Sequence, residues 1–224
     1  MHIEPGIVDG AKSLLGYATA VVTAGYGLKY SAEVLRTSGP AATATRSVIA
    51  TGLVLAFFQL LPHPPVGVSE VHLILGSTLF LLFGAVPAGV GLASGLLLQG
   101  GIFAPFDLPQ YGMNLTTLLV PLFAMDAVAR QVVKPGTRYV DLEYRQVLTL
   151  SATFQSGIVA WVMFWSFYGH GFTVETVQSV ATFSAAYLTV IFLEPLVDLA
   201  VLAVAKTFKT ECPIFLEKRL LSAA

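Results

Sequence analysis

The four histidines are the residues of this chain that could bind a late first-row metal ion, because imidazole is the commonest protein ligand for such ions. They are His2, His63, His72 and His170. His2 directly follows Met1. A free Met1 amine, the deprotonated His2 amide nitrogen and the His2 imidazole can form fused chelate rings, which place three nitrogens in one plane. A second imidazole would complete a square-planar, all-nitrogen site of the kind that suits Ni(II) or Cu(II).

Each histidine also has a plainer interpretation. The Met1-His2 end of the chain could be a frayed terminus without a ligand. His72 begins an apolar stretch, where a histidine is more often buried and hydrogen-bonded than metal-binding. His63, in Leu-Pro-His-Pro-Pro, and His170, in Gly-His-Gly, are interpreted as loop residues near lipid headgroups. The residues alone therefore make Met1 and His2 a candidate chelate and leave the second imidazole open.

The elements that must position these residues follow from composition. Of the 224 residues, 55% are hydrophobic and only 11% are charged, whereas a soluble domain has about 45–50% and about 25%. This excess of apolar residues excludes a soluble globule and a disordered chain. A net charge of −1 argues against a nucleic-acid-binding protein, and a single Cys excludes an internal disulfide framework or a zinc finger.

The sequence predicts an all-α membrane bundle of about seven transmembrane helices, because a span needs about 20 mostly apolar residues. The apolar stretches cover residues 11–30, 47–61, 71–85, 88–103, 115–133, 147–168 and 177–208. The third and fourth are short, and the sequence predicts that they form a helical hairpin broken by Pro87. We expect one integral membrane domain over residues 1–224, with residues 1–10 as its chelating segment.

The basic residues predict the orientation of the bundle, since Lys and Arg concentrate on the cytoplasmic side of membrane proteins. With seven helices and the N-terminus outside, the C-terminus is cytoplasmic and every Lys and Arg except Lys12 lies on the inner side. All four histidines then lie outside. The predicted metal-binding face is therefore the outer one.

Four short motifs, in chain order, carry a resemblance to a known family. They are Met1-His2-Ile3-Glu4-Pro5-Gly6, Ser69-Glu70-Val71-His72-Leu73, the stretch from Ala93 to Gly101 that ends in Leu-Leu-Leu-Gln99-Gly-Gly, and Gly112-Met113-Asn114-Leu115. The chain resembles the CbiM/NikM family, the substrate-binding membrane components of energy-coupling-factor importers for cobalt and nickel. It departs from the family pattern in the order of Glu4 and Pro5 and in Glu70, which is inserted into the family's Ser-Val-His-Leu.

The resemblance implies a ligand set for the transported ion. The Met1 amine, the His2 amide and imidazole, and His72 would hold Ni²⁺ or Co²⁺ as cargo, without a resident cofactor. Asn114, Glu70 and Ser69 are candidates for hydrogen bonds to the ligands, since ligating histidines usually need such a partner. For Asn114 the alternative is an N-cap of the fifth helix.

The resemblance also implies partners and a location. The chain contains no Gly-x-x-x-x-Gly-Lys-Ser/Thr loop, so separate ATPase subunits, a transmembrane coupling subunit and a small accessory membrane subunit, expected as a separate polypeptide, would power import. The chain itself is then not an enzyme, and it would lie in the inner or plasma membrane of a prokaryote. The alternatives are a structural or assembly membrane subunit without a transported metal, and an importer component for an organic vitamin.

Acidic and small residues within the predicted helices have open roles. Asp126 is four residues before Arg130, the spacing of a helical ion pair. Glu194 and Asp198 could relay a cation inward or could serve polar packing or a membrane partner. Gly91 and Gly95 at i, i+4 permit close helix packing.

Overall fold

The structure is a computed structural model that describes residues 6–207 and 214–222, so the predicted ligands Met1 and His2 lie outside the described residues. Over those residues it contains eight α-helices and a two-stranded hairpin. The helices are α1 (Ser13–Ser38), α2 (Pro40–Leu60), α3 (Gly76–Phe83), α4 (Ala85–Ile102), α5 (Tyr111–Val132), α6 (Tyr144–His170), α7 (Val174–Ala205) and α8 (Lys218–Leu221); the strands are β1 (Pro65–Val66) and β2 (Ser69–Glu70).

The prediction of an all-α membrane protein is confirmed. Five helical segments are long and apolar enough to cross a bilayer: Pro40–Leu60, Ala85–Ile102, Pro105–Val132, Tyr144–His170 and Val174–Ala205. The Pro105–Val132 segment joins a short 3₁₀ helix to α5. α1 has 26 residues but is rich in Gly and Ala, and it is not among these five. The count of seven crossings and the orientation of the termini stay predictions.

Local signals in the sequence explain where the helices end. Gly39 has a φ of 82°, which ends α1, and Pro40 begins α2 at the position where its missing N–H is tolerated. Gly171, with a φ of 77°, ends α6. Thr173 caps α7, because its hydroxyl accepts a hydrogen bond of 3.2 Å from the Thr176 amide.

The prediction of a third helix over residues 71–85 is wrong in its extent. The prediction that Pro87 breaks the helical hairpin is also wrong. Only Gly76–Phe83 is helical, and eight residues rise about 12 Å, which is too short to cross a bilayer alone. Gly84, with a φ of 85°, separates α3 from α4. Pro87 lies in the first turn of α4, where a missing N–H costs no intrahelical bond. The sequence between the hairpin and α3 is therefore irregular backbone inside the bundle.

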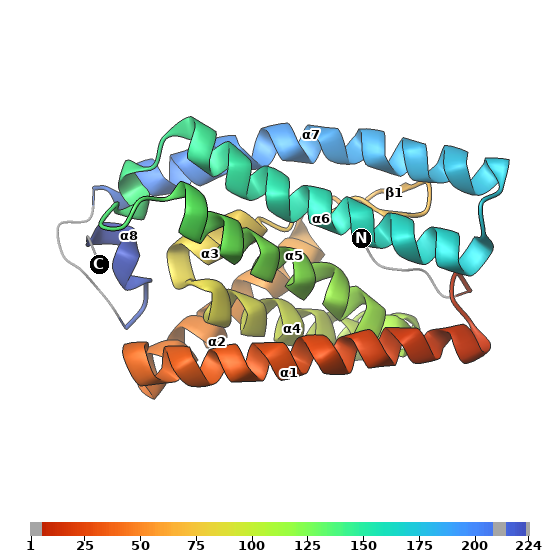
Figure 1. Cartoon of the computed structure of the whole chain (residues 1–224), viewed down its shortest axis with the longest axis horizontal. Coiled ribbons are helices and arrows are strands. Elements are labelled where there is room, and N and C mark those ends of the chain that lie inside the picture. The colour runs from red at the N-terminus through yellow and green to blue at the C-terminus, as the bar shows by residue number, and fades with distance from the viewer. Residues whose placement is uncertain (1–5, 208–213, 223–224) are drawn as a thin grey trace.

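The helices form an elongated bundle with α3 at its centre. Figure 1 shows α6 and α7 along one long side, α1 along the other, and α3, α4 and α5 between them. α3 contacts α2, α4, α5, α6 and α7, and all of its residues except Leu82 are buried. Irregular backbone is tolerated at membrane depth only where protein encloses it, and this packing supplies the enclosure.

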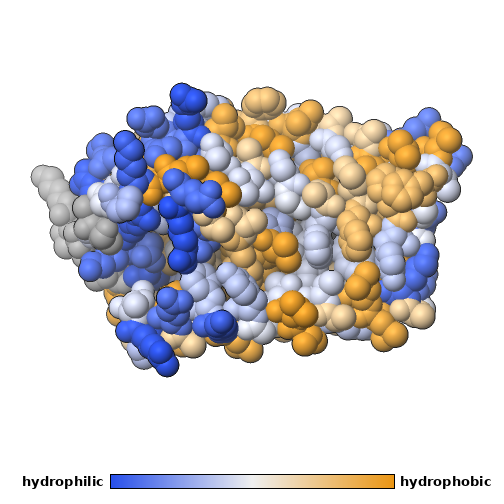
Figure 2. Space-filling model, in the orientation of Figure 1, coloured by the Kyte–Doolittle hydropathy of each residue, from blue (hydrophilic) through white to orange (hydrophobic). Residues whose placement is uncertain are grey.

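Charged side chains gather at one end of the bundle. One end carries α8, the α1–α2 and α3–α4 turns and the α5–α6 connection (Figure 1), and Figure 2 shows hydrophilic residues gathered there beside a largely apolar middle. Asp141, in the α5–α6 connection, pairs with Arg138 at 2.6 Å and with Lys206, after α7, at 2.8 Å. These two cations lower the pKa of the Asp141 carboxyl. The prediction that this end faces the cytoplasm depends on such a grouping, since Lys and Arg concentrate on the cytoplasmic side of membrane proteins.

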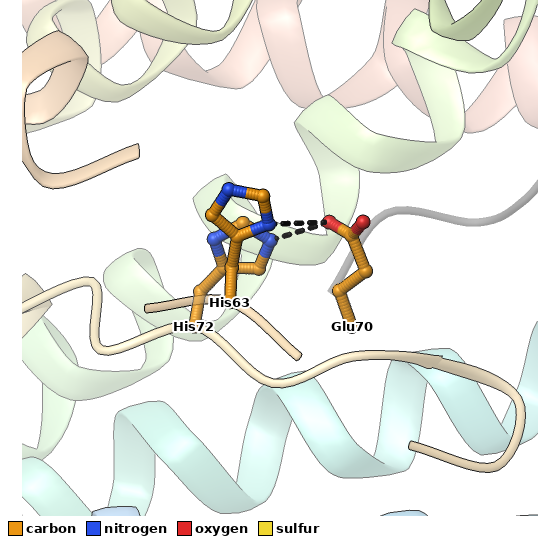
Figure 3. A group of neighbouring side chains, drawn as sticks. All are labelled: His63, Glu70 and His72. Carbon is orange, nitrogen blue, oxygen red and sulfur yellow. Dashed lines mark hydrogen bonds and ion pairs between the residues drawn. The ribbon is translucent and has the colours of Figure 1, made fainter. Parts of the chain in front are cut away.

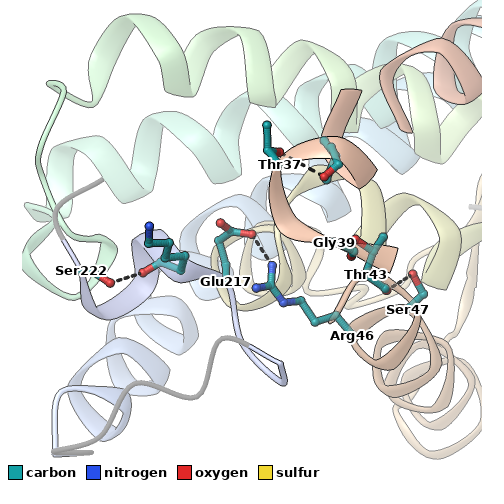
Figure 4. A network of polar contacts seen from close by, with 9 residues as sticks. Thr37, Gly39, Thr43, Arg46, Ser47, Glu217 and Ser222 are labelled. Carbon is teal, nitrogen blue, oxygen red and sulfur yellow. Dashed lines mark hydrogen bonds and ion pairs between the residues drawn. The ribbon is translucent and has the colours of Figure 1, made fainter. Parts of the chain in front are cut away.

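Residues 214–222 close this same end of the bundle. Arg46 of α2 is buried and forms an ion pair of 2.7 Å with Glu217, which Figure 4 shows beside the α1–α2 turn. The Glu217 amide donates to the Leu82 carbonyl at 2.7 Å. Leu220 is fully buried. The segment therefore seals the junction of α2, α3 and α4.

The predicted close packing at Gly91 and Gly95 is confirmed, and it joins α4 to α2. A Cβ on Gly91 would lie 2.6 Å from the Ala50 Cβ, and one on Gly95 would lie 2.5 Å from the Val54 Cγ1. Both distances are shorter than van der Waals contact. Only glycine lets the two helices approach this closely.

We expect Gly91→Ala to destabilise the bundle by about 1–3 kcal/mol, the usual cost of overpacking a well-packed interface. The measurement is the thermal unfolding midpoint of the purified protein in detergent. Gly101→Ala is the matched control on the same helix, because a Cβ there meets nothing within 4 Å. The control midpoint should stay the same or rise, since alanine favours helix. Equal midpoints for the two variants would show that the α2–α4 contact is not tight.

Candidate metal site

The hairpin between α2 and α3 positions His72. Gly67, in the two-residue turn, has a φ of +62°, which few side-chain-bearing residues adopt. A Cβ on Gly67 would lie only 2.1 Å from the Ser179 carbonyl oxygen, so the turn is pressed against α7. The Val71 amide then donates to the Pro64 carbonyl at 3.1 Å, directly before His72. The hairpin is thus docked against a membrane helix and delivers His72 into the bundle.

Three side chains of this loop converge (Figure 3). His72 Nε2 lies 2.8 Å from Glu70 Oε2, and His63 Nδ1 lies 3.7 Å from the same oxygen. The two imidazole rings are stacked, with centroids 5.1 Å apart and planes 3° apart. One ligand atom from each of the three side chains lies within 4.8 Å of the others.

Burial differs across the cluster. The His72 side chain is 2% exposed, Glu70 is 29% exposed and His63 is 44% exposed. Phe58 of α2 packs edge-on against the His72 ring, with centroids 5.5 Å apart. His72 is therefore the inner member of the cluster, backed by an aromatic side chain, and His63 is the outer member.

This arrangement can bind a divalent cation in two ways. Two imidazole nitrogens and a carboxylate oxygen form a donor set that suits Zn, Ni, Co or Cu. Alternatively, Glu70 accepts a hydrogen bond from one nitrogen of His72 and so fixes the ring orientation and tautomer, as carboxylates commonly do for ligating histidines. In both cases Glu70 sets the position of the His72 ring.

The remaining predicted residues are found as follows. The structure brings Glu70 and His72 together, while Met1 and His2 lie outside the described residues. Ser69 is fully buried in β2. Asn114 is buried too, in the first turn of α5 and outside the three-residue cluster. The alternative that Asn114 is a helix N-cap is wrong, because α5 begins at Tyr111 and its N-cap is Gln110.

Sequence reasoning missed His63, which it interpreted as an ordinary loop residue. The β1–β2 register pairs Pro65 with Glu70 and Val66 with Ser69. Continued outward by two residues, this register places His63 opposite His72, on the same face as Glu70, since side chains alternate along a strand. The signal was the Gly-containing two-residue turn between short extended segments, which is typical of a hairpin.

We expect Glu70→Gln to weaken Co²⁺ binding by about 10–100-fold, the usual effect of removing a carboxylate that orients or supplements a metal ligand. Isothermal titration of the purified protein with Co²⁺ measures this effect. Glu175→Gln, at an exposed position at the start of α7, is the matched control and should bind as the unchanged protein does. An affinity of Glu70→Gln within error of that control would remove Glu70 from the site.

Comparison with known proteins connects this geometry to a family. Residues 2–212 match CbiM, described as the cobalt uptake substrate-specific transmembrane region. The match spans the hairpin and α1 to α7. No curated protein and no solved structure matches the chain.

Proposed function

The chain belongs to the CbiM family, the substrate-specific transmembrane region of cobalt uptake, and from this premise we propose that it captures Co²⁺ or Ni²⁺ at its outer face as the substrate-binding component of an ATP-driven, energy-coupling-factor importer. It is a membrane transport component rather than an enzyme. The cation is its cargo, and no resident cofactor is required.

The observation that carries the proposal is the convergence of His63, Glu70 and His72. Their donor types suit late first-row divalent ions. The cluster belongs to a loop that joins two membrane helices and is held against α7. Between a metal bound there and the hydrophilic end of the bundle lie α3 and the charged segments around α8.

The proposed ligand set combines the first two residues of the sequence with the loop between α2 and α3. The Met1 amine and the His2 amide and imidazole supply three nitrogens, and His72 supplies the fourth. Glu70 orients His72 through the 2.8 Å contact. His63, stacked on His72, supplies a partly exposed imidazole at which an incoming ion can first exchange its water.

The proposed partners follow from what the chain lacks. Its sequence contains no phosphate-binding Gly-x-x-x-x-Gly-Lys-Ser/Thr loop, so separate ATPase subunits and a transmembrane coupling subunit would provide the energy, with a small accessory membrane subunit beside them. The basic end of the bundle is a candidate surface for these subunits. The proposed location is the plasma or inner membrane of a prokaryote.

The test is metal binding by the purified chain and its dependence on His72. We expect saturable binding of Co²⁺, with Ni²⁺ as a competitor whose relative affinity indicates the preferred cargo. A structural or assembly subunit would bind neither ion tightly. That result would leave family membership intact and contradict the proposed capture role.

A further inference from the structure

An apolar groove lies between α1, α4 and α5, and the metal site described above uses no part of it. The volume of the groove is about 270 Å³. Leu115 and Leu119 of α5 form its buried inner wall. At its rim, Leu28 of α1 is 73% exposed and Val90 of α4 is 41% exposed. The groove is therefore open to the bilayer.

α1 leaves this groove open because it packs on the bundle along few residues. Of its 26 residues, Gly16 and Thr23 are the buried ones. The side of α1 that lines the groove carries small residues at Ala24 and Gly27, which fill little of the space toward α4. An apolar space holds no stable water, so at membrane depth an apolar chain fills it.

The groove continues into a polar pocket at the charged end of the bundle. The pocket has a volume of about 190 Å³ and shares Ala85 and Val86 with the groove. Its ionisable side chains come from four segments: Tyr30 of α1, Asp126 of α5, Tyr139 of the α5–α6 connection and Glu217 before α8. A molecule that occupies both spaces must be apolar at one end and polar at the other.

Each carboxylate of the pocket uses one oxygen for its ion pair. Asp126 Oδ2 accepts from Arg130 Nε at 3.1 Å and from the Tyr30 hydroxyl at 3.0 Å. Glu217 Oε2 accepts from Arg46 at 2.7 Å (Figure 4). Within residues 6–207 and 214–222, no hydrogen bond reaches Asp126 Oδ1 or Glu217 Oε1. The pocket therefore offers two carboxylate oxygens to a further donor.

Tyr139 supplies a third acceptor beside these carboxylates. Burial raises the pKa of Tyr139 to about 12, and the charges of Glu217 and Asp126 act in the same direction against that of Arg219. The phenol is therefore neutral at physiological pH, and its oxygen can accept a hydrogen bond. Three acceptors in one pocket equal the number of donors on a primary ammonium group.

Arg130 adds a cation at the rim of the same pocket. Its side chain is 62% exposed. Its Nε and Nη2 donate to Asp126 and Tyr30, whereas Nη1 has no hydrogen bond to the part of the chain that the structure describes. A guanidinium group binds phosphate well. Ammonium acceptors and a phosphate donor thus lie together at the polar end of the groove.

We propose that the groove and the pocket bind one phospholipid whose headgroup carries a primary ammonium. One acyl chain lies in the groove, the ammonium group lies between Asp126 and Glu217, and the phosphate binds Arg130. The lipid fills the gap between α1 and α4 and so holds α1 against the bundle. A choline headgroup has methyl groups in place of the three N–H donors and cannot form these hydrogen bonds. The site is independent of metal capture.

The test adds one of three lipids with identical dioleoyl chains to the delipidated protein in detergent. We expect phosphatidylethanolamine to raise the thermal unfolding midpoint by about 5–10 °C more than phosphatidylcholine or phosphatidylglycerol, the shift for a ligand at about 100 times its Kd in a chain of this size. Equal shifts would show an unselective apolar surface, and a larger shift with phosphatidylglycerol would show recognition of the phosphate alone. No shift would leave the groove to a helix of a membrane partner. Each of these three results would overturn the proposal.

Two variants test where the chain and the headgroup lie, each measured against its own lipid-free midpoint. Ala24→Leu fills the groove and should abolish the shift with phosphatidylethanolamine, whereas Ala18→Leu, at an exposed position of α1 outside the groove, should keep it. Asp126→Asn should remove the preference over phosphatidylcholine. Asp141→Asn, at the same end of the bundle but outside the pocket, should keep that preference. A full shift in Ala24→Leu, or a full preference in Asp126→Asn, would overturn the proposal.

Discussion

His72→Ala is expected to weaken Co²⁺ binding at the outer site by more than 100-fold, because loss of a direct ligand exceeds the about 10–100-fold effect of losing a residue that supports a ligand. His72 is the buried member of the cluster, between Phe58 and Glu70. The other imidazole of the cluster, His63, is the exposed member. The measurement is the Co²⁺ dissociation constant of the purified protein.

His170→Ala is the matched control for this prediction. His170 is an exposed histidine at the last position of α6, and its removal should leave the dissociation constant unchanged. The thermal unfolding midpoint of both variants, measured without metal, separates loss of a ligand from loss of the fold. A His72→Ala protein that folds and binds Co²⁺ at full affinity would contradict the proposed site.

Blocking the amino terminus is expected to have an effect of similar size. One residue added before Met1 converts the amine into a peptide amide, which removes a donor and shifts His2 out of the position that closes the chelate rings. We expect Co²⁺ affinity at the outer site to fall by more than 100-fold, because a direct ligand is lost. Competition titration against a chromophoric chelator measures this change.

The extended protein also tests an alternative ligand set that does not include the amino terminus. His63, Glu70 and His72 alone present three donors within 4.8 Å. If these three form the complete protein ligand set, the extended protein binds as well as the unextended one, and His63→Ala becomes the damaging variant. The same residue added at the C-terminus is the control for nonspecific effects of lengthening the chain.

Much of the fold could be predicted because its signals are local. Apolar stretches gave the long helices, and Gly39-Pro40 marks the boundary between α1 and α2 in the sequence itself. The predicted helical pair Asp126–Arg130 is confirmed at 3.1 Å, and Tyr30 of α1 also donates to Asp126 at 3.0 Å. The α1 partner was not predictable, because it lies 96 positions away in the chain.

The third helix was mispredicted because hydropathy does not distinguish a buried helix from a buried extended segment. Residues 71–75 are as apolar as those of α3, yet they are extended or irregular, and Leu75 has a φ of 56°. The left-handed conformation of Leu75 costs about 1–2 kcal/mol. Packing of α3 against five helices offsets a local preference of that size.

The sequence by itself determined the class of this protein: a helical membrane protein with scarce charges grouped at one end, and with histidine, carboxylate and amide groups as its candidates for chemistry. These properties depend on composition and on interactions between near neighbours. Only the tertiary structure decided which candidates meet. The docking of Gly67 on α7 fixes the hairpin whose register sets His63 opposite His72, and the irregular entry into α3 turns Ser77 toward Glu194 and Asp198. Such contacts join segments far apart in the chain, and their geometry depends on packing that no local pattern encodes.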